Sequence, residues 1–142
     1  MNSVEIWTCE ACGREFGKHR QAHVCAPAMP IDAYFDGRPA ADREVFEAVR
    51  GHLESLGPVI VEPVGVGILF KRRRTFVELR PRARGGFSLS VGLNRRLVHP
   101  RVSRTTRTKT ASTYHGINVA VPADIDVELR QWLTESYFEF AE

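Results

Sequence analysis

The pattern of apolar and polar positions predicts two amphipathic helices, one at each end of the longer part of the chain. Residues 39–56 carry apolar side chains at helical spacing, and Gly57 and Pro58 end this segment. Pro122 suits the first position of a second helix, and acidic residues follow it near the positive end of the helix dipole. The positions expected to face the core are Phe46, Val49, Leu53 and Leu56, and then Ile125, Leu129, Trp132, Leu133, Ser136, Tyr137 and Phe140.

Between these helices the pattern changes to that of β-strands. Runs rich in β-branched and apolar residues span 59–64, 66–71, 75–80, 87–93 and 113–121. In residues 87–93 apolar side chains alternate with Ser and Gly, as in a strand with one buried face. Residues 94–110 show neither period and are expected to be irregular. Together these segments predict an α+β fold with an antiparallel four- to five-stranded sheet and two helices on one face.

All three cysteines lie within the first 25 residues and have the spacing of a metal site. Cys9 and Cys12 precede Gly13, a pattern typical of a knuckle whose tight turn brings two thiolates to one ion. His23 and Cys25 lie two residues apart and share a side only in an extended or turn conformation. Four such ligands leave no position for water, so the sequence predicts a structural Zn²⁺ site formed by Cys9, Cys12, His23 and Cys25.

A second ligand set remains open at the same place. His19 and His23 would lie on one face of a helix and form a Cys2His2 finger that leaves Cys25 free, with Phe16 as its core aromatic. The loop between the ligand pairs of such fingers is about a dozen residues long. Here only six residues separate Cys12 from His19, and ten separate it from His23. The spacing therefore favours the Cys3His set.

Prolines mark the boundary between this small module and the rest of the chain. Pro27 and Pro30 favour an extended linker, and Ile31, Tyr34 and Phe35 form an apolar patch expected to hold it against the larger domain. We therefore predict a zinc-binding module in residues 1–26, a Pro-rich linker in residues 27–38 and an α+β domain in residues 39–142.

Charge is distributed unevenly along the chain. Residues 71–110 carry 13 Lys and Arg and one acid, a net charge of +12, whereas residues 1–70 carry −4 and residues 111–142 carry −5. Such a basic segment needs an anion nearby, supplied either by the acidic flanks or by a partner such as nucleic acid, another polyanion or a phosphorylated ligand. On one strand face, Arg74 and Arg80 could meet phosphates and Phe76 could stack on a base. The residues predicted to bind nucleic acid or another anion are Lys71, Arg72, Arg73, Arg74, Arg80, Arg82 and His115.

The chain lacks the motifs of several large enzyme classes. It contains no GxxxxGK(S/T), GxGxxG or GxSxG motif and no cysteine beyond the metal module. His99 and His115 are the candidates for acid–base chemistry. We expect a non-catalytic zinc-containing protein that binds nucleic acid through its arginine-rich surface. The alternatives are an anionic-ligand-binding domain or enzyme with a pocket near His115, and an adaptor that binds a protein partner.

The N-terminus has neither the basic start nor the apolar core of a secretory signal. No run approaches the roughly 18 apolar residues that a membrane-spanning helix needs. We therefore expect a cytoplasmic protein without a membrane partner.

Four segments resemble a bacterial family known as domain of unknown function 5655. They are the helix end in residues 52–57, the block FKRRRTFVELRP in residues 70–81, the pair His115-Gly116 and the last helix in residues 124–137. The N-terminal module followed by residues 26–38 is similar to the usual partner of this domain in a subset of actinobacterial members. The resemblance implies the domain boundaries, and the family name carries no activity.

Overall fold

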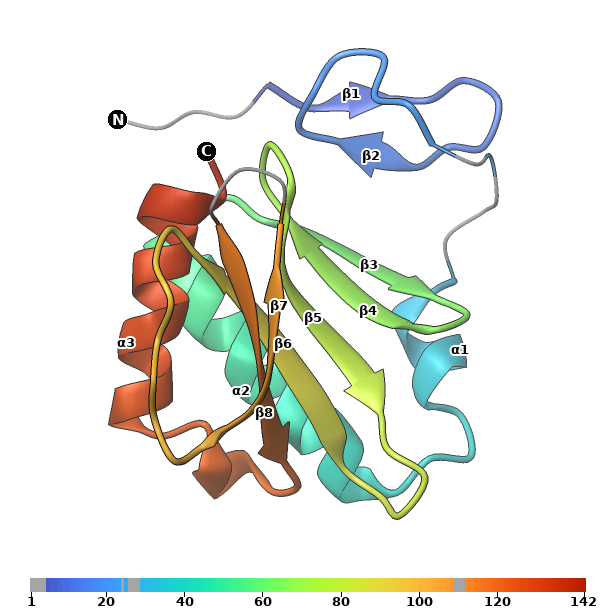
Figure 1. The fold of residues 1–142 in the computed structure, drawn as a ribbon. Coiled ribbons are helices and arrows are strands. Elements are labelled where there is room, and N and C mark those ends of the chain that lie inside the picture. The colour runs from blue at the N-terminus through green and yellow to red at the C-terminus, as the bar shows by residue number, and fades with distance from the viewer. Residues whose placement is uncertain (1–4, 24, 26–28, 109–111) are drawn as a thin grey trace.

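A six-stranded antiparallel sheet forms the centre of the molecule, in the order β3-β4-β5-β6-β8-β7 (Figure 1). The computed structural model describes residues 5–23, 25, 29–108 and 112–142. The strands of this sheet are β3 (Ile60–Val64), β4 (Gly67–Lys71), β5 (Thr75–Pro81), β6 (Phe87–Leu93), β7 (Val102–Arg107) and β8 (Thr113–Val119). A separate two-stranded sheet consists of β1 (Trp7–Thr8) and β2 (Glu15–Phe16).

The helical segments are α1 (Ile31–Phe35), α2 (Ala40–Leu56), η1 (Pro122–Asp124), α3 (Val127–Glu135) and η2 (Ser136–Phe140). The second predicted helix is thus divided into a 3-10 turn, an α-helix and a π-helical end. Asp126 begins α3, because its side chain accepts a hydrogen bond from the Leu129 N–H at 3.0 Å. No helix among the described residues is both long and apolar enough to cross a membrane.

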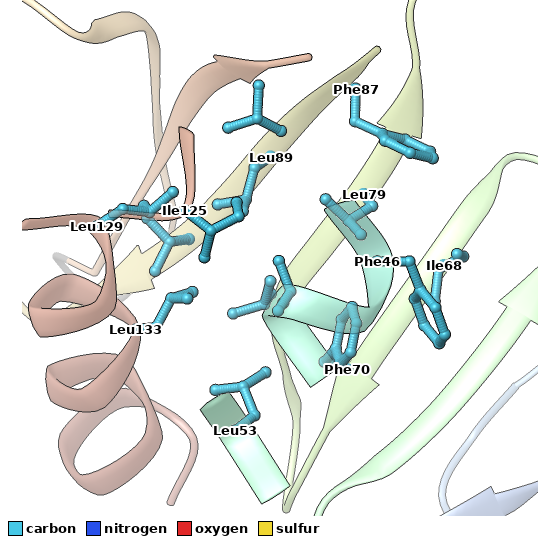
Figure 2. Packing of buried hydrophobic residues seen from close by; sticks show 14 of the residues in the cluster. Phe46, Leu53, Ile68, Phe70, Leu79, Phe87, Leu89, Ile125, Leu129 and Leu133 are labelled. Carbon is cyan, nitrogen blue, oxygen red and sulfur yellow. The ribbon is translucent and has the colours of Figure 1, made fainter. Parts of the chain in front are cut away.

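The core lies between one face of the sheet and the helices α2 and α3 (Figure 2). Phe46 and Leu53 of α2 and Leu133 of α3 are fully buried against the sheet. The strands contribute their alternate residues to the same cluster, including Leu79 and Leu89, which face each other across β5 and β6. The predicted α+β fold is therefore confirmed, and each of the seven positions expected to be buried in the last helical segment is buried.

The prediction of four to five strands was wrong, because β7 lies in the stretch that we expected to be irregular. Five of the six residues of β7 are exposed, so the strand carries no apolar alternation. Among the described strands it pairs with β8 alone, at the edge of the sheet. The available signal was its β-branched content, since Val102, Thr105 and Thr106 favour extended backbone.

Part of the range predicted as linker is helical. The helix α1 places Tyr34 and Phe35 in the core, 3% and 7% exposed. The apolar patch therefore packs against the larger domain as expected. The beginning of the predicted linker, with Pro27, lies outside the described residues.

Candidate metal centre and arginine-lined sheet face

The strands β1 and β2 form a hairpin that carries the first two cysteines. Trp7 pairs with Phe16, and between the strands the Gly13 N–H donates to the Cys9 carbonyl at 2.8 Å. Gly13 has a φ of 74°, in the left-handed region that glycine adopts without steric cost. This tight turn places the thiols of Cys9 and Cys12 on the same side of the hairpin, as a knuckle requires.

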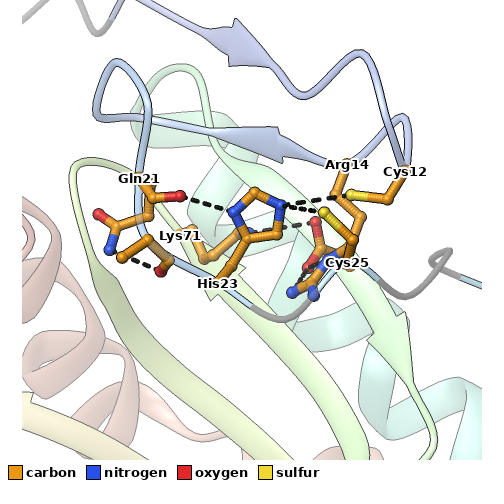
Figure 3. A network of polar contacts seen from close by, with 8 residues as sticks. Cys12, Arg14, Gln21, His23, Cys25 and Lys71 are labelled. Carbon is orange, nitrogen blue, oxygen red and sulfur yellow. Dashed lines mark hydrogen bonds and ion pairs between the residues drawn. The ribbon is translucent and has the colours of Figure 1, made fainter.

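Four ligand atoms converge beside this turn. The donor atoms of Cys9, Cys12, His23 and Cys25 all lie within 4.8 Å of one another and could hold a metal ion. The sulfur atoms of Cys9 and Cys25 are 3.8 Å apart. His23 Nε2 lies 3.4 Å from Cys12 Sγ and 3.5 Å from Cys25 Sγ, and Figure 3 shows the imidazole ring turned toward both thiols.

The orientation of His23 is set by a second contact. Its Nδ1 lies 2.6 Å from the Gln21 carbonyl oxygen, which accepts the Nδ1 proton and leaves the Nε2 lone pair directed at the thiols. Metal-bound histidines are commonly held in one tautomer by such a partner on the other nitrogen. The His23 ring also packs on Phe16, with 4.3 Å between ring centres.

Hydrogen bonds adjust the proton affinities of the thiols. The backbone N–H of Cys12 lowers the pKa of the Cys9 thiol to about 6, against a smaller opposing effect of burial. The hydrogen bond with Cys9 raises the pKa of Cys25 to about 11, and burial acts in the same direction.

His19, the rival ligand, is not among the residues that converge at this site. Its ring lies edge-on to Trp7, with 6.0 Å between ring centres. Cys25 is instead 3.8 Å from Cys9. The arrangement of the described residues is therefore Cys3His, not Cys2His2.

The metal module contacts the larger domain through Glu62 of β3, a carboxylate with only 4% of its side chain exposed. Arg14 Nε donates to Glu62 Oε1 at 2.8 Å, and Lys71 Nζ donates to Glu62 Oε2 at 3.1 Å. Burial lowers the pKa of Lys71, an effect that the Glu62 carboxylate opposes. The module backbone also lies directly on the turn after β4, because a Cβ atom at Gly17 would be 1.7 Å from the Arg72 carbonyl oxygen.

The turn at residues 72–74 joins β4 to β5, as the sequence predicted, but two of its arginines have structural contacts. Arg72 is 1% exposed, stacks 4.1 Å from the centre of the Tyr137 ring and donates to the Tyr137 carbonyl and the Glu142 carboxylate. Arg74 Nε donates to the Phe140 carbonyl at 2.6 Å. Both Arg73 and Arg74 are exposed. The turn therefore anchors the C-terminal segment through Arg72 and Arg74 and presents the Arg73 side chain to solvent.

His115 is fully buried and both of its ring nitrogens have partners. Nδ1 lies 3.3 Å from the Val91 carbonyl, and Nε2 accepts a hydrogen bond from the Leu97 N–H at 2.8 Å. Burial lowers the pKa of His115, which favours the neutral ring that this pair of contacts needs. His115 thus fixes the loop after β6 to the sheet and offers no nitrogen to a ligand. Its predicted anion-binding role has no support in this geometry.

Phe76, expected to stack on a base, is fully buried and lies edge-on to Tyr137 with 5.9 Å between ring centres. The register of β4 with β5 shifts at this position, because Phe70 pairs with Val77 and Lys71 with Thr75, and Phe76 is the extra residue between them. Such a bulge redirects a side chain, which is consistent with the burial of Phe76 in the core. Phe76 therefore cannot act as a stacking platform.

The face of the sheet opposite the helices is open and bears a hollow of about 680 Å³. Across this face Glu78, Ser90, Gly116 and Arg104 stand in one row of paired residues. Arg80 lies beside them on β5, with its side chain 58% exposed and paired with Glu78. The residues that line the hollow are Val64, Val66, Leu69, Thr75, Glu78, Arg80, Ser88, Ser90, Arg104, Thr106 and Tyr114.

A smaller hollow of about 240 Å³ adjoins this face at Leu69 and Thr75. It lies between the metal module and the 72–74 turn, and Arg73 is part of its wall. Arg82 is exposed in the turn between β5 and β6. Of the predicted anion-binding residues, four are therefore exposed, namely Arg73, Arg74, Arg80 and Arg82, and of these Arg74 also donates to the Phe140 carbonyl. The other three, Lys71, Arg72 and His115, are buried.

Arg104 was not among the predicted binding residues. It lies on the open face because β7 pairs with β8 and extends the sheet. Other arginines of the basic segment meet the acidic C-terminal part. Arg95 pairs with Glu135 at 2.8 Å, and Arg101 pairs with Asp126 at 2.9 Å. The acidic flanks therefore neutralise part of the positive charge of residues 71–110.

The fold and the ligand cluster define an α+β protein with a candidate Cys3His metal centre packed beside an open sheet face. A family model described as Domain of unknown function (DUF5655) matches residues 31–138. The chain therefore belongs to this family, as the sequence segments indicated, and the metal module precedes the matched region. Comparison with curated proteins and with solved structures gave no match.

Proposed function

We propose that this chain is a non-catalytic zinc protein that binds nucleic acid through arginines on the open face of its sheet. The observation that carries the proposal is the hollow of about 680 Å³, with Arg80 and Arg104 on different strands of its floor. Arginine is the side chain best suited to phosphate, because its planar fork donates two parallel hydrogen bonds.

The distances between ligand atoms support Zn²⁺ as the bound ion. A tetrahedral zinc with bonds of about 2.3 Å to sulfur and about 2.0 Å to nitrogen separates two sulfurs by about 3.8 Å and sulfur from nitrogen by about 3.5 Å. The corresponding separations here are 3.8 Å for Cys9 and Cys25, and 3.4 and 3.5 Å for His23 with its two neighbouring thiols. We expect one zinc per chain in protein purified without chelators, measured by atomic emission.

The chemistry of the hollow suits a sugar–phosphate backbone. Four serine and threonine side chains line the hollow together with the two arginines: Thr75, Ser88, Ser90 and Thr106. Hydroxyl groups commonly donate to phosphate and sugar oxygens. Glu78 opposes such a ligand, since its carboxylate lies in the same hollow and pairs with Arg80. A phosphate that displaces the Glu78 carboxylate would bind the Arg80 guanidinium in its place.

The metal module would contribute one wall of the site. Gly17 lies against the backbone of the 72–74 turn, and Phe16 and Arg73 line the same small hollow. Because the module is fixed there by Glu62, the bound ion would hold a rigid boundary at this end of the open face.

The test is fluorescence anisotropy of the zinc-loaded protein with labelled single- and double-stranded DNA and RNA across a salt series. Binding should weaken steeply with salt, because each phosphate contact releases counterions. The double variant Arg80→Ala/Arg104→Ala should lower the affinity at least about tenfold, since two exposed cations are lost. Arg72 and Arg74 stay intact in this test, because they donate to the backbone carbonyls of Tyr137 and Phe140 and so hold the C-terminal segment.

Two further variants sharpen the result. Arg43→Ala/Arg50→Ala removes the same charge from α2, where both arginines pair with acids, and should leave the affinity nearly unchanged. Glu78→Gln removes the acid from the hollow and should strengthen binding severalfold. Absence of binding at low salt, or equal losses in the two arginine pairs, would contradict the proposal.

A further inference from the structure

The sheet has two edges, and only one is open for a further strand. The β3 edge contains Pro63, which has no N–H to donate, and the Pro63 carbonyl accepts a hydrogen bond from the Met29 N–H at 3.0 Å. The helix α1 also packs beside β3. At the other end, β7 pairs with β8 on one side and has no strand on its other side within the described residues. An exposed edge of this kind is a template for an added strand.

Alternate residues of β7 reach two different hollows. Arg104 and Thr106 line the hollow on the open face of the sheet. Thr105 and Arg107 line another of about 370 Å³ together with Arg96 and Thr113. A strand added beside β7 would direct its side chains alternately to these two sides. The added strand would therefore meet arginine side chains on both of its faces.

The charges beside this edge indicate the kind of partner. Among the ion pairs of the described residues, none involves Arg96, Arg104 or Arg107. Pairing of β7 with β7 of a second copy would bring these arginines together across the interface, and like charges in opposing positions destabilise paired strands. An acidic strand would instead neutralise them.

We propose that β7 binds an extended acidic peptide segment of another protein as a seventh strand of the sheet. Main-chain hydrogen bonds to the open edge provide the part of the affinity that does not depend on the peptide's side chains. Arg104 on one side and Arg96 with Arg107 on the other select acidic side chains. The threonines of β7 suit this role, because they favour the extended backbone without adding an apolar surface.

The experiment uses the full zinc-loaded chain and a fluorescein-labelled, capped peptide of sequence VEEVEEV, which carries acids on both strand faces. Binding is followed by anisotropy at low salt. A related peptide carries an N-methyl group on every residue. Strand pairing predicts that this peptide loses binding, because alternate N–H groups of a strand point to opposite sides and full methylation blocks both edges.

Charge variants of the protein provide the second readout. Arg104→Glu and Arg107→Glu should each lower the affinity about fivefold or more, since an attractive contact becomes repulsive. Arg82→Glu, in the turn between β5 and β6, is the matched control and should have little effect. Thermal denaturation checks that the three variants are folded.

Three results would overturn the proposal. The first is equal binding of the methylated and the unmethylated peptide, which would indicate association by charge without strand pairing. The second is unchanged affinity after reversal of Arg104 and Arg107. The third is a reversible dimer of the free chain that the peptide does not dissociate, which would assign the edge to a second copy.

Discussion

At the scale of single residues, burial decides which of the many cations can meet a ligand. Lys71, Arg72 and Arg73 follow one another in the sequence, yet only Arg73 is exposed. Lys71 is held by Glu62 beneath the metal module, and Arg72 by Glu142 and Tyr137. The same residue type therefore has a structural role at one position and is available for binding at the next.

Glu62 is the residue whose loss should matter most at this scale. Glu62→Ala leaves Arg14 and Lys71, whose side chains are 13% and 6% exposed, without their common anion. Breaking a buried ion pair by removing one partner costs about 3 kcal/mol or more. We expect a loss of this size in the free energy of unfolding, measured by urea denaturation.

The control for this change is Glu54→Ala on α2, an exposed residue whose carboxylate forms no ion pair among the described residues. Its effect should stay within about 0.5 kcal/mol, as for surface substitutions in general. If the two variants were equally stable, Glu62 would not be the anchor of the module.

At the scale of elements, close backbone packing joins the hairpin of β1 and β2 to the larger sheet. The strand β2 ends at Phe16, and Gly17 directly after it meets the carbonyl of Arg72. No side chain, however small, fits between these two backbones. The contact needs glycine for space and not for its conformational freedom.

Gly17→Ala should therefore separate the module from the turn. The added Cβ would lie 1.7 Å from the Arg72 carbonyl oxygen and 2.8 Å from Arg73 Cα, both of them backbone atoms that cannot rotate away. We expect faster amide hydrogen exchange in residues 71–75 and a lower midpoint of thermal unfolding. The metal ligands themselves are unchanged, so the zinc content should remain near one per chain.

Gly51→Ala is the matched control in α2. A Cβ atom at Gly51 has nothing within 4 Å, and alanine is the better helix former by about 1 kcal/mol. This variant should be slightly more stable than the parent chain. If Gly17→Ala and Gly51→Ala changed the midpoint of thermal unfolding in the same way, the packing at Gly17 would be looser than the structure indicates.

At the scale of the whole molecule, the two parts of the chain have separate sources of stability. The larger domain has a continuous apolar core, whereas the module buries little beyond Cys9 and Phe16. A hairpin with strands of two residues each is too small to fold alone. The module should therefore depend on its metal ion, as small metal-binding domains generally do.

Metal removal tests this division. Treatment with a strong chelator under reducing conditions should unfold the module and leave the larger domain intact. The chain has two tryptophans, Trp7 in β1 and Trp132 in α3, so two indole N–H signals report on the two parts in an NMR spectrum. Only the Trp7 signal should move to its unfolded position, and added Zn²⁺ should restore it. Loss of both signals would show that the module also supports the core.

Local spacing was enough to predict that the four candidate ligands meet, and it also predicted most of the elements. Cys9, Cys12, His23 and Cys25 lie close together in sequence, so the spacing alone restricts how they can meet. The strands around the core also carry a readable period, because one face of each is buried. The edge strand β7 escaped detection for the complementary reason: it buries almost nothing.

Only the tertiary structure decided where the charges can act. Arg72 is buried against Tyr137, which lies 65 residues away in the sequence. His115 accepts a hydrogen bond from the Leu97 N–H, which belongs to another segment. Arg104 joins Arg80 on the open face because three strand pairings place them there. Such contacts depend on packing between distant segments, and no local pattern of residues encodes them.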